Sequence, residues 1–516
     1  MTGSPLEDRR TLWIVGAVTL LLFLIADLPW QLDDYDQAKQ AFTSFEIIKE
    51  GHWFYQRTPH EHVATKPPLV GWISAALFAL TRSWEVAWRL PSFLAAVAIA
   101  ILLFRAGHSM DGHGANRLAP GGGEDEGEAS SSYAAIVGLI ALSAFGLNLL
   151  SPRLATLVRT DMPLALVIFL IGLLIWRKIQ RQEEWKPRDR IYIFALLTAA
   201  MLIKGPIVYA FLLPGIALFQ WRTGRARPPG APFQSRISAW SGWWPWIASL
   251  GVFLLWVIGG ILFQPGFVDE VVIREFIGRF GETIHRPQPL YFYLPHLLHK
   301  FTPWSVLMIA LAAFDLASRR WRIGVAFREM SPATFWLLCW SLGGLMVMSL
   351  IPSKRVDRIF PVIPPLCLLL AAQIGNIFRH EQLRTRVYRW SAVALILSIL
   401  ITGGYTVAKV IFGYRDHRDA LVVFGREVRH EAEVHQWRYE VVSPKDEGLL
   451  LYLQRTHFIK PDRAVAEWNG GNLDALVAPT EEASALMRKL HDAALSQLKS
   501  NERREGQGRG YVLITR

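Results

Sequence analysis

An acidic pair and a lysine bracket the first long polar segment of this 516-residue chain. Asp33 and Asp34 come directly after the first apolar run, and Lys66-Pro67-Pro68 closes the segment. A carboxylate at a membrane boundary is costly to desolvate, so it is usually paired or functional. An N-cap for the helix expected over 38–48 explains one carboxylate at most. The other is predicted to serve in binding or proton transfer.

Charged residues also lie in short turns between later apolar runs. Asp161 closely follows Arg153 and Arg159. Contacts with lipid head groups would also explain these two arginines. Because Asp161 opens an apolar run, its charge suits a helix N-terminus, and a structural and a functional role stay equally open for it. Lys204 begins the hinge Lys204-Gly205-Pro206. A charge in a tight hinge between two spans is expected to have a binding role.

The segment 265–300 adds two further candidates. It begins with an amphipathic helix, expected over 266–280, and ends in Tyr291-Phe292-Tyr293. An interfacial helix and an aromatic belt explain most of this pattern. Arg279 and His285 go beyond it, so both are predicted to contact the substrate.

The last polar turn, 352–358, contains three cations: Lys354, Arg355 and Arg358. Arginine suits a phosphate because its planar guanidinium donates two parallel hydrogen bonds. Carboxylates can orient or deprotonate an acceptor, and cations can hold a phosphate as leaving group. A lipid-linked phosphate sugar fits such a set, since its tail lies in the bilayer. The chain has no Gly-rich phosphate loop or Rossmann pattern, which disfavours a soluble nucleotide-sugar donor.

The composition predicts a polytopic membrane protein. The chain is 52% apolar with 21 tryptophans, and only 19% of its residues are charged. These values exclude disorder and disfavour a soluble globular enzyme. The net charge of +12 is explained by basic cytoplasmic loops rather than by nucleic-acid binding. Cys339 and Cys367 both lie in apolar runs, so no disulfide framework is expected.

The elements that must position the candidates are predicted from the apolar runs. Eleven runs have spanning or near-spanning length: 12–30, 88–107, 133–151, 162–177, 190–203, 206–221, 243–264, 301–318, 332–351, 357–377 and 388–411. The first is expected to be a retained signal anchor, because no small-x-small cleavage site follows it. The shorter run 68–82 falls below the roughly 20 residues needed to cross a bilayer, so it is predicted to lie along the interface.

This topology sorts the charged segments by side. The basic loops then share the cytoplasmic side with Arg9-Arg10, as the positive-inside rule requires. Those loops are 177–190, 222–236, 319–328 and 379–389. The acidic stretch 121–128 is expected to be a flexible linker on that side. The candidate residues face outward, in the segments 31–67, 152–161, 204–206, 265–300 and 352–358.

The chain is therefore divided into two predicted domains. Residues 1–411 form a transmembrane catalytic module, whose segments 31–67 and 265–300 are its outer catalytic loops. Residues 412–516 alternate strand-like and helix-like patterns and predict a small soluble α/β domain on the outer side. That domain carries no motif of its own, so a lid or packing role is expected.

Taken together, the motifs resemble the bacterial branch of the GT-C membrane glycosyltransferases, the family of lipid A aminoarabinose transferases and relatives of protein O-mannosyltransferases. The resemblance runs over roughly the first 365 residues. It is carried, in family order, by Asp33-Asp34 with Ala38, Gly51-His52-Trp53, Lys66-Pro67-Pro68, Arg89-Leu90-Pro91, Arg159-Thr160-Asp161, Lys204-Gly205, Arg279-Phe280, His285 with Tyr291-Phe292-Tyr293, and Lys354 with Pro361. Each motif is weak alone, and their order and spacing make the likeness specific.

The resemblance implies a GT-C fold, a polyprenyl-phosphate-sugar donor and an acceptor met on the periplasmic side. It implies that Asp33 is the main catalytic carboxylate and Asp161 a second functional acid. It also implies that Lys66, Lys204 and Arg279 handle the lipid phosphate.

The chain departs from this family at positions associated with a metal. Thr65 stands where the aminoarabinose transferases have an acid, and Phe276 where they have a histidine. His52, His60, Glu61 and His62 lie near, but their spacing matches no closed ligand set. We therefore expect no metal site, although a divalent metal stays open, and specificity for aminoarabinose and lipid A is not implied.

The sequence thus predicts a multi-pass enzyme of the bacterial inner membrane, with its active site on the periplasmic side. It would transfer a sugar from undecaprenyl phosphate or a similar carrier to a lipid, glycan or protein acceptor. Asp33, Asp34 and Asp161 are the predicted catalytic residues. The predicted phosphate-binding residues are Lys66, Arg159, Lys204, Arg279, His285, Lys354 and Arg358. The alternatives are a flippase of lipid-linked sugars and a non-catalytic glycolipid scaffold.

Overall fold

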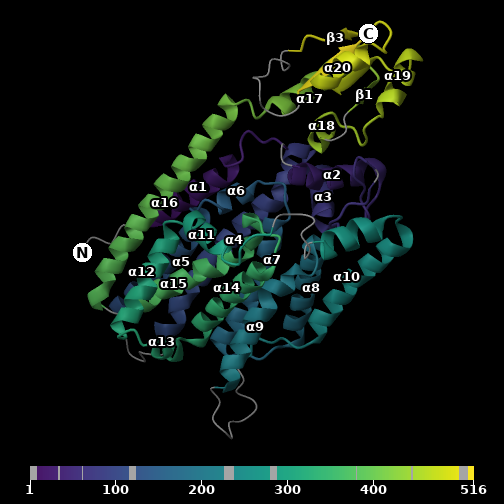
Figure 1. The fold of residues 1–516 in the computed structure, drawn as a ribbon. Coiled ribbons are helices and arrows are strands. Elements are labelled where there is room, and N and C mark those ends of the chain that lie inside the picture. The colour runs from purple at the N-terminus through teal and green to yellow at the C-terminus, as the bar shows by residue number, and fades with distance from the viewer. Residues whose placement is uncertain are drawn as a thin grey trace. The chain divides into compact units, whose positions relative to one another are not determined.

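The computed structural model describes residues 9–32, 35–60, 62–115, 124–225, 238–278, 287–378, 381–442, 446–498 and 510–516. The chain divides into two compact units. The large unit comprises Met1–Ala26 and Arg89–Val407, and the small unit comprises Asp27–Trp88 and Ala408–Arg516. Each unit is described by itself (Figure 1).

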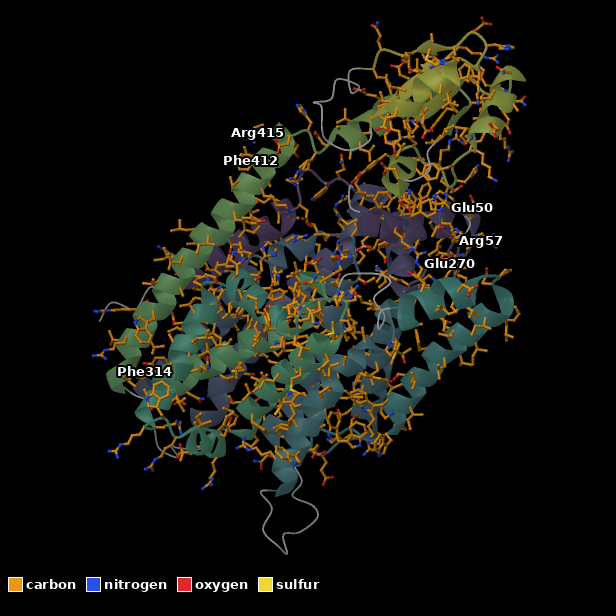
Figure 2. The ribbon with its side chains drawn as sticks, viewed as in Figure 1. Glu50, Arg57, Glu270, Phe314, Phe412 and Arg415 are labelled. Carbon is orange, nitrogen blue, oxygen red and sulfur yellow. The ribbon has the colours of Figure 1, made fainter. Side chains whose placement is uncertain are left out.

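The large unit is helical. Its elements are α1 (Arg9–Ile25), α4 (Trp84–Ala115), α5 (Glu124–Gly146), α6 (Ser151–Ala155), α7 (Asp161–Arg181), α8 (Pro187–Lys204), α9 (Ile207–Arg225), α10 (Trp244–Phe263), the π-helix η2 (Val268–Ile277), α11 (Tyr293–Lys300), α12 (Trp304–Ser318), α13 (Ile323–Glu329), α14 (Pro332–Leu350), the 3-10 helix η3 (Val356–Val362), α15 (Ile363–Phe378) and α16 (Glu381–Arg415). Helix α4 begins, and α16 ends, in residues of the small unit. Near that end of α16, the Arg415 guanidinium lies 4.4 Å from the Phe412 ring centroid (Figure 2).

Each of the eleven predicted apolar runs contains a helix, so the prediction of a multi-pass membrane protein is confirmed. Within the described residues, six helices are long and apolar enough to cross a membrane, and a seventh span is formed if the bent pair α11–α12 counts as one. The number eleven stays a prediction. The predicted linker 121–128 is partly wrong, because α5 is already helical from Glu124.

Helix α7 lies against α8, α9 and α14 (Figure 1). Its apolar sequence is largely buried, and it ends at Gln182, which adopts a left-handed conformation. A side chain at Gly172 would overlap the indole of Trp340, so glycine allows α14 to approach closely. The Trp336 Nε1 group donates to the Gly172 carbonyl at 3.1 Å. These contacts fix α7, whose two ends carry the polar groups described below.

The small unit combines helices with one sheet. Its elements are α2 (Tyr35–Glu50), α3 (Leu69–Thr81), α17 (Ala420–His435), β1 (Tyr439–Val441), α18 (Glu447–Tyr452), α19 (Pro461–Asn469), β2 (Ala475–Pro479), α20 (Thr480–Met487), β3 (Ala494–Leu495) and β4 (Tyr511–Thr515). The strand order is β1-β2-β4-β3. Strand β1 is parallel to β2, and β4 is antiparallel to both of its neighbours. Trp468 and Ile514 are fully buried in its core.

This arrangement confirms the predicted α/β character of residues 412–516, including the strands expected near 439, 475 and 511. The short run 68–82 contains α3, and the helix expected over 38–48 is α2. Whether α3 lies along an interface stays a prediction, as does the domain boundary after residue 411.

Residues of the first polar segment and of the tail are joined within the small unit. The Tyr452 hydroxyl accepts from the Leu32 amide at 2.8 Å, and the Gln31 side chain accepts from the Leu421 amide at 3.1 Å. Thr456 Oγ1 donates to Glu50, labelled in Figure 2, at 2.8 Å. Helix α18 also packs on α2. The tail and the first polar segment therefore form one compact body.

Candidate functional site

The segment 159–161, at the start of α7, carries two buried ion pairs. Lys204 Nζ lies 2.5 Å from Asp161 Oδ1. Arg159 Nη1 lies 2.7 Å from Asp357 Oδ2. None of these four side chains is more than 12% exposed. Three polar turns that are far apart in the sequence thus meet at one end of α7.

Buried polar residues hold this segment in place. The Asn148 Oδ1 atom accepts from the amides of Leu150 and Ser151, at 2.8 and 2.9 Å, at the start of the short helix α6. Ser92 Oγ donates to the Leu157 carbonyl at 2.8 Å. Sequence reasoning missed Asn148 and Ser92. Their only signal was a polar residue within an apolar run, which many structural residues share.

The Asp161–Lys204 pair benefits from two helix dipoles. Asp161 is the first residue of α7, and Lys204 is the last residue of α8. A carboxylate is favourable at a helix N-terminus and an ammonium at a C-terminus. Because α7 and α8 pack as consecutive helices, these two ends lie side by side. Gly205, with a φ of +74°, lets the chain turn directly after Lys204.

The turn 352–358 brings the remaining cations. Lys354 Nζ donates to the Gln288 carbonyl at 2.8 Å, and the Gln288 amide donates to the Pro352 carbonyl at 3.2 Å. Arg358 Nη1 donates to the Ser353 carbonyl at 2.7 Å. The turn is therefore attached to the chain that precedes α11 by main-chain and side-chain bonds. Sequence reasoning quoted Asp357 only as part of this basic run and missed its pairing.

We call Arg159, Asp161, Lys204, Lys354, Asp357 and Arg358 the α7-start cluster. It contains four cations and two carboxylates, so its formal charge is +2. Lys354 is 6% exposed and forms no ion pair within the described ranges. Burial lowers the pKa of this amine below its usual range. A buried cation that lacks a counter-charge is costly, so Lys354 favours a bound anion beside it.

The other predicted site residues are placed differently. Asp33, Asp34, Arg279 and His285 lie outside the described residues. Lys66 is half-buried in the small unit, directly before α3. The helix predicted over 266–280 corresponds to η2, which contains Glu270, labelled in Figure 2. Glu270 pairs with Arg274 at 3.5 Å. The roles of all ten predicted residues stay predictions.

The Gly51-His52-Trp53 motif has a structural explanation in the small unit. His52 Nδ1 contacts the buried carboxylate of Glu46, and burial raises the pKa of Glu46 to about 6. The Trp53 carbonyl accepts from Trp72 Nε1 and Gln56 Nε2, both at 2.6 Å. The motif therefore attaches the segment that follows α2 to helix α3.

The family's metal finds no ligand set in the part of the chain that the structure describes. No three His, Cys, Asp or Glu side chains there gather closely enough to hold an ion. Thr65, at one expected ligand position, is buried and offers only a hydroxyl. The described residues do not fit this metal.

No protein-family model matches the chain. It is 25% identical, over 416 residues, to undecaprenyl phosphate-alpha-4-amino-4-deoxy-L-arabinose arabinosyl transferase 1 of Sodalis glossinidius; the match covers 77% of this chain and 66% of that protein. It is 24% identical, over 380 residues, to the corresponding transferase of Shewanella sediminis, with coverage of 72% and 62%. The chain thus spans somewhat less than two thirds of these relatives.

Two solved structures have the same fold. ArnT from Cupriavidus metallidurans bound to undecaprenyl phosphate matches with a TM-score of 0.67 at 17% identity, over 97% of both chains. The same protein in the apo state matches with a TM-score of 0.66 at 16% identity, over 98% of both chains. The predicted GT-C fold and the resemblance to the aminoarabinose transferases are confirmed.

Proposed function

We propose that this protein is a glycosyltransferase that moves a sugar from a polyprenyl-phosphate carrier to a lipid, glycan or protein acceptor. The observation that carries the proposal is the α7-start cluster, in which the buried Lys354 amine forms no ion pair within the described residues. An anionic lipid head group supplies a counter-charge for that amine. The names of the relatives, and the undecaprenyl phosphate bound to ArnT, support a donor of this kind.

In the proposed reaction, the bond between the sugar's anomeric carbon and the carrier's phosphate oxygen breaks. Its electron pair leaves with the phosphate, which gains negative charge. Lys354, Arg358 and Arg159 stabilise that charge, because preorganised cations in a poorly solvated site act more strongly than in water. Lys66, Lys204, Arg279 and His285 are proposed to complete the phosphate-binding set.

The acceptor oxygen forms the new bond to the same carbon. When the acceptor is a hydroxyl, its proton passes to a carboxylate, for which we propose Asp33. Asp34 assists, and Asp161 assists by holding the Lys204 amine through their 2.5 Å contact. No step of this scheme requires a metal ion.

We further propose that the protein lies in the bacterial inner membrane with this site on the periplasmic side. The positions of the basic loops support that orientation, since Lys and Arg gather on the cytoplasmic side of membrane proteins. Cysteine labelling of intact vesicles at position 204 and at position 181, the two ends of the α7–α8 hairpin, tests it. Labelling of both from the same side would contradict the orientation.

The transfer itself is tested with purified protein in lipid vesicles, labelled polyprenyl-phosphate sugars and a membrane extract. We expect a labelled product from the wild-type protein and almost none from Asp33→Asn or Lys204→Gln. Arg181→Gln is the matched control, because that side chain is 55% exposed at the other end of the hairpin. It should transfer as the wild type does.

The same assay separates the two alternatives. A flippase would move the labelled lipid between leaflets without a new product, and a scaffold would bind it unchanged. Either result, with a well-folded protein, would overturn the proposed transferase.

A further inference from the structure

A second polar site lies within the small unit. It is a cleft of about 840 Å³, whose lining includes Pro59 and His60 of the first polar segment and residues 457–461 of the tail, which lead into α19. Glu440 of β1 and Glu482 of α20 complete its walls. This volume falls within the roughly 300–1,000 Å³ that small-molecule sites occupy. Nothing above assigns this cleft a ligand.

The wall that contains His60 is a small hairpin. The Ala64 amide donates to the Gln56 carbonyl at 2.7 Å, and the Thr58 amide donates to the His62 carbonyl at 2.8 Å. These bonds fix the hairpin in the first polar segment, which begins at the predicted catalytic acids. The cleft therefore joins the predicted acceptor side of the enzyme to the α/β tail, within one compact unit.

The charges around the cleft compensate one another. Arg463 Nε lies 2.8 Å from Glu467 Oε1. Arg455 Nη1 lies 3.8 Å from Glu440 Oε1. The remaining charged side chains of the lining are Glu482 and Lys460, one of each sign. Arg455 does not line the cleft, but with it counted the three carboxylates are matched by three cations. The cleft therefore has almost no net charge with which to select an ion.

Polar groups in the cleft are nevertheless available to a ligand. Within the described residues, Glu482 and Lys460 form no ion pair. A carboxylate only accepts and an ammonium only donates. A hydroxyl group does both, so a ligand with several hydroxyls can satisfy both side chains.

Aromatic rings provide the apolar part. The His60 and Phe458 rings are stacked, with centroids 5.5 Å apart and planes inclined by 29°. His60 is exposed and Phe458 half-exposed, so both rings keep surface toward the cleft. A sugar ring presents C–H groups on its face and hydroxyls on its rim, which matches flat apolar rings surrounded by donors and acceptors.

We propose that this cleft binds an uncharged carbohydrate portion of the acceptor. Its place in the reaction rests on the proposed transferase, but carbohydrate binding itself does not. Phe458 and His60 contact the sugar face, and Glu482 and Lys460 hydrogen-bond to its hydroxyls. The tail would then hold an extended acceptor while its reacting end lies at the catalytic acids.

Saturation-transfer NMR on the full chain in lipid nanodiscs tests the proposal, with maltotriose, mannotriose and triacetylchitotriose as probes. We expect saturable binding of at least one of them. Because the ligand is uncharged, its affinity should change less than about twofold between 50 and 500 mM NaCl. Phe458→Ala should weaken binding by about fivefold or more.

Two further variants keep the test decisive. Glu482→Gln, which alters no packed ring, should weaken binding about threefold if its carboxylate accepts from the sugar. Phe412→Ala is the matched control, because it removes an aromatic ring that is 46% exposed outside the cleft. It should bind as the wild type does, and unchanged melting temperatures exclude unfolding as the cause.

The proposal is overturned if none of the three sugars binds, or if Phe458→Ala and Glu482→Gln both bind normally. Salt-sensitive binding of trilysine instead of the sugars would also overturn it, in favour of a cationic peptide. Transfer activity without sugar binding would contradict carbohydrate binding in the cleft and leave the proposed transferase activity standing. Sugar binding without transfer would support the cleft and contradict the transferase activity.

Discussion

Helix α7 carries buried charged groups at both of its ends, and the two sets differ in kind. Asp161 begins the helix, and Lys178 lies near its end. With a rise of about 1.5 Å per residue, the 17 residues between them correspond to roughly 26 Å, most of the thickness of a bilayer core. The same helix is long and apolar enough to cross a membrane and carries a polar cluster at each end.

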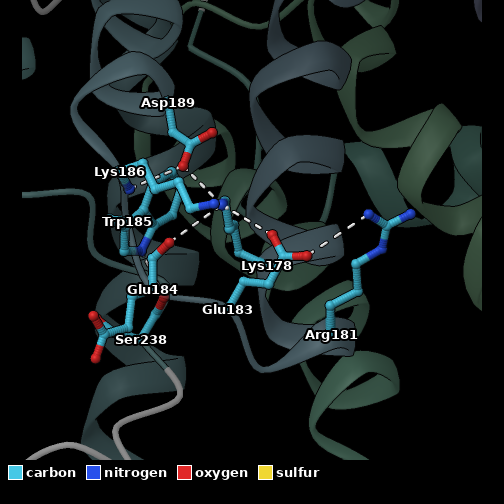
Figure 3. A network of polar contacts seen from close by, with 8 residues as sticks. All are labelled: Lys178, Arg181, Glu183, Glu184, Trp185, Lys186, Asp189 and Ser238. Atoms are coloured by element: carbon cyan, nitrogen blue, oxygen red, sulfur yellow. Dashed lines mark hydrogen bonds and ion pairs between the residues drawn. The ribbon is translucent and has the colours of Figure 1, made fainter.

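At the end of α7, the charged side chains around Lys178 compensate one another and come from one short stretch of the sequence (Figure 3). Lys178 Nζ lies 2.7 Å from Asp189 and 3.1 Å from Glu183, and it donates to the Glu184 carbonyl at 3.2 Å. All of these partners lie within eleven residues of Lys178. The six charged residues of this Lys178 network are Lys178, Arg181, Glu183, Glu184, Lys186 and Asp189, three of each sign.

The α7-start cluster has the opposite character. Its ion pairs join residues 43 and 198 positions apart, and four cations face two carboxylates. A local, balanced network satisfies its own charges and ties two helices together. A set gathered from distant turns, in which the buried Lys354 amine has no ion pair within the described residues, leaves that amine for a ligand. The comparison indicates that burial alone does not identify a functional charge. A buried charge is a candidate for function when no nearby opposite charge compensates it.

The largest expected effect is that of Asp161→Asn on transfer. The change keeps the side-chain volume but removes the counter-charge of Lys204, so we expect kcat to fall about a thousandfold. The melting temperature should also fall, because the buried Lys204 amine loses its partner, so rates are compared per folded molecule. Initial rates with a labelled polyprenyl-phosphate sugar provide the measurement. If the variant is less stable but transfers normally per folded molecule, the role of Asp161 is structural and not catalytic.

Lys178→Met should show the converse. Removing one partner of a buried ion pair leaves Asp189 uncompensated, so we expect the free energy of unfolding to fall by about 3 kcal/mol. Denaturation in detergent measures this loss. Transfer per folded molecule should stay within about twofold of the wild type, and a selective loss of kcat would contradict the proposed division.

Lys354→Met tests the uncompensated cation at the α7 start. Burial lowers the pKa of this amine, which means that the folded state already disfavours its charge. Methionine removes that cost and loses one hydrogen bond, worth about 1 kcal/mol. We expect unchanged or higher thermal stability together with donor binding weakened about tenfold, measured by titration with the labelled lipid. Lower stability with normal donor affinity would exclude the proposed role.

The smallest effect is a pH dependence at the Lys178 network. The hydrogen bond from Lys178 holds the pKa of Glu183 below its ordinary 4.5. The stabilisation is therefore fully present above pH 4.5 and is lost as the pH falls through the lower, folded-state pKa. Melting temperatures from pH 7 to pH 3.5 should fall slightly less for Glu183→Gln than for the wild type. Identical slopes would show that this contact contributes nothing.

The sequence by itself determined the features that depend on local patterns. Apolar runs predicted the helices, because each run must bury its main-chain groups in hydrogen bonds whatever its neighbours are. Alternating residues near 439, 475 and 511 predicted three strands of the tail. The turns that hold Arg159, Lys204 and Lys354 were also found from the sequence, since a charge between apolar runs stands out against its surroundings.

Only the tertiary structure decided which of these residues meet. The Arg159–Asp357 pair joins residues 198 positions apart, and no periodicity encodes such a partner. The structural role of His52 depends on Glu46 being buried beside it, which is a property of packing and not of the motif. The cleft lined by His60 and Phe458 likewise exists only because the tail folds against the first polar segment, and local hydropathy does not predict that contact.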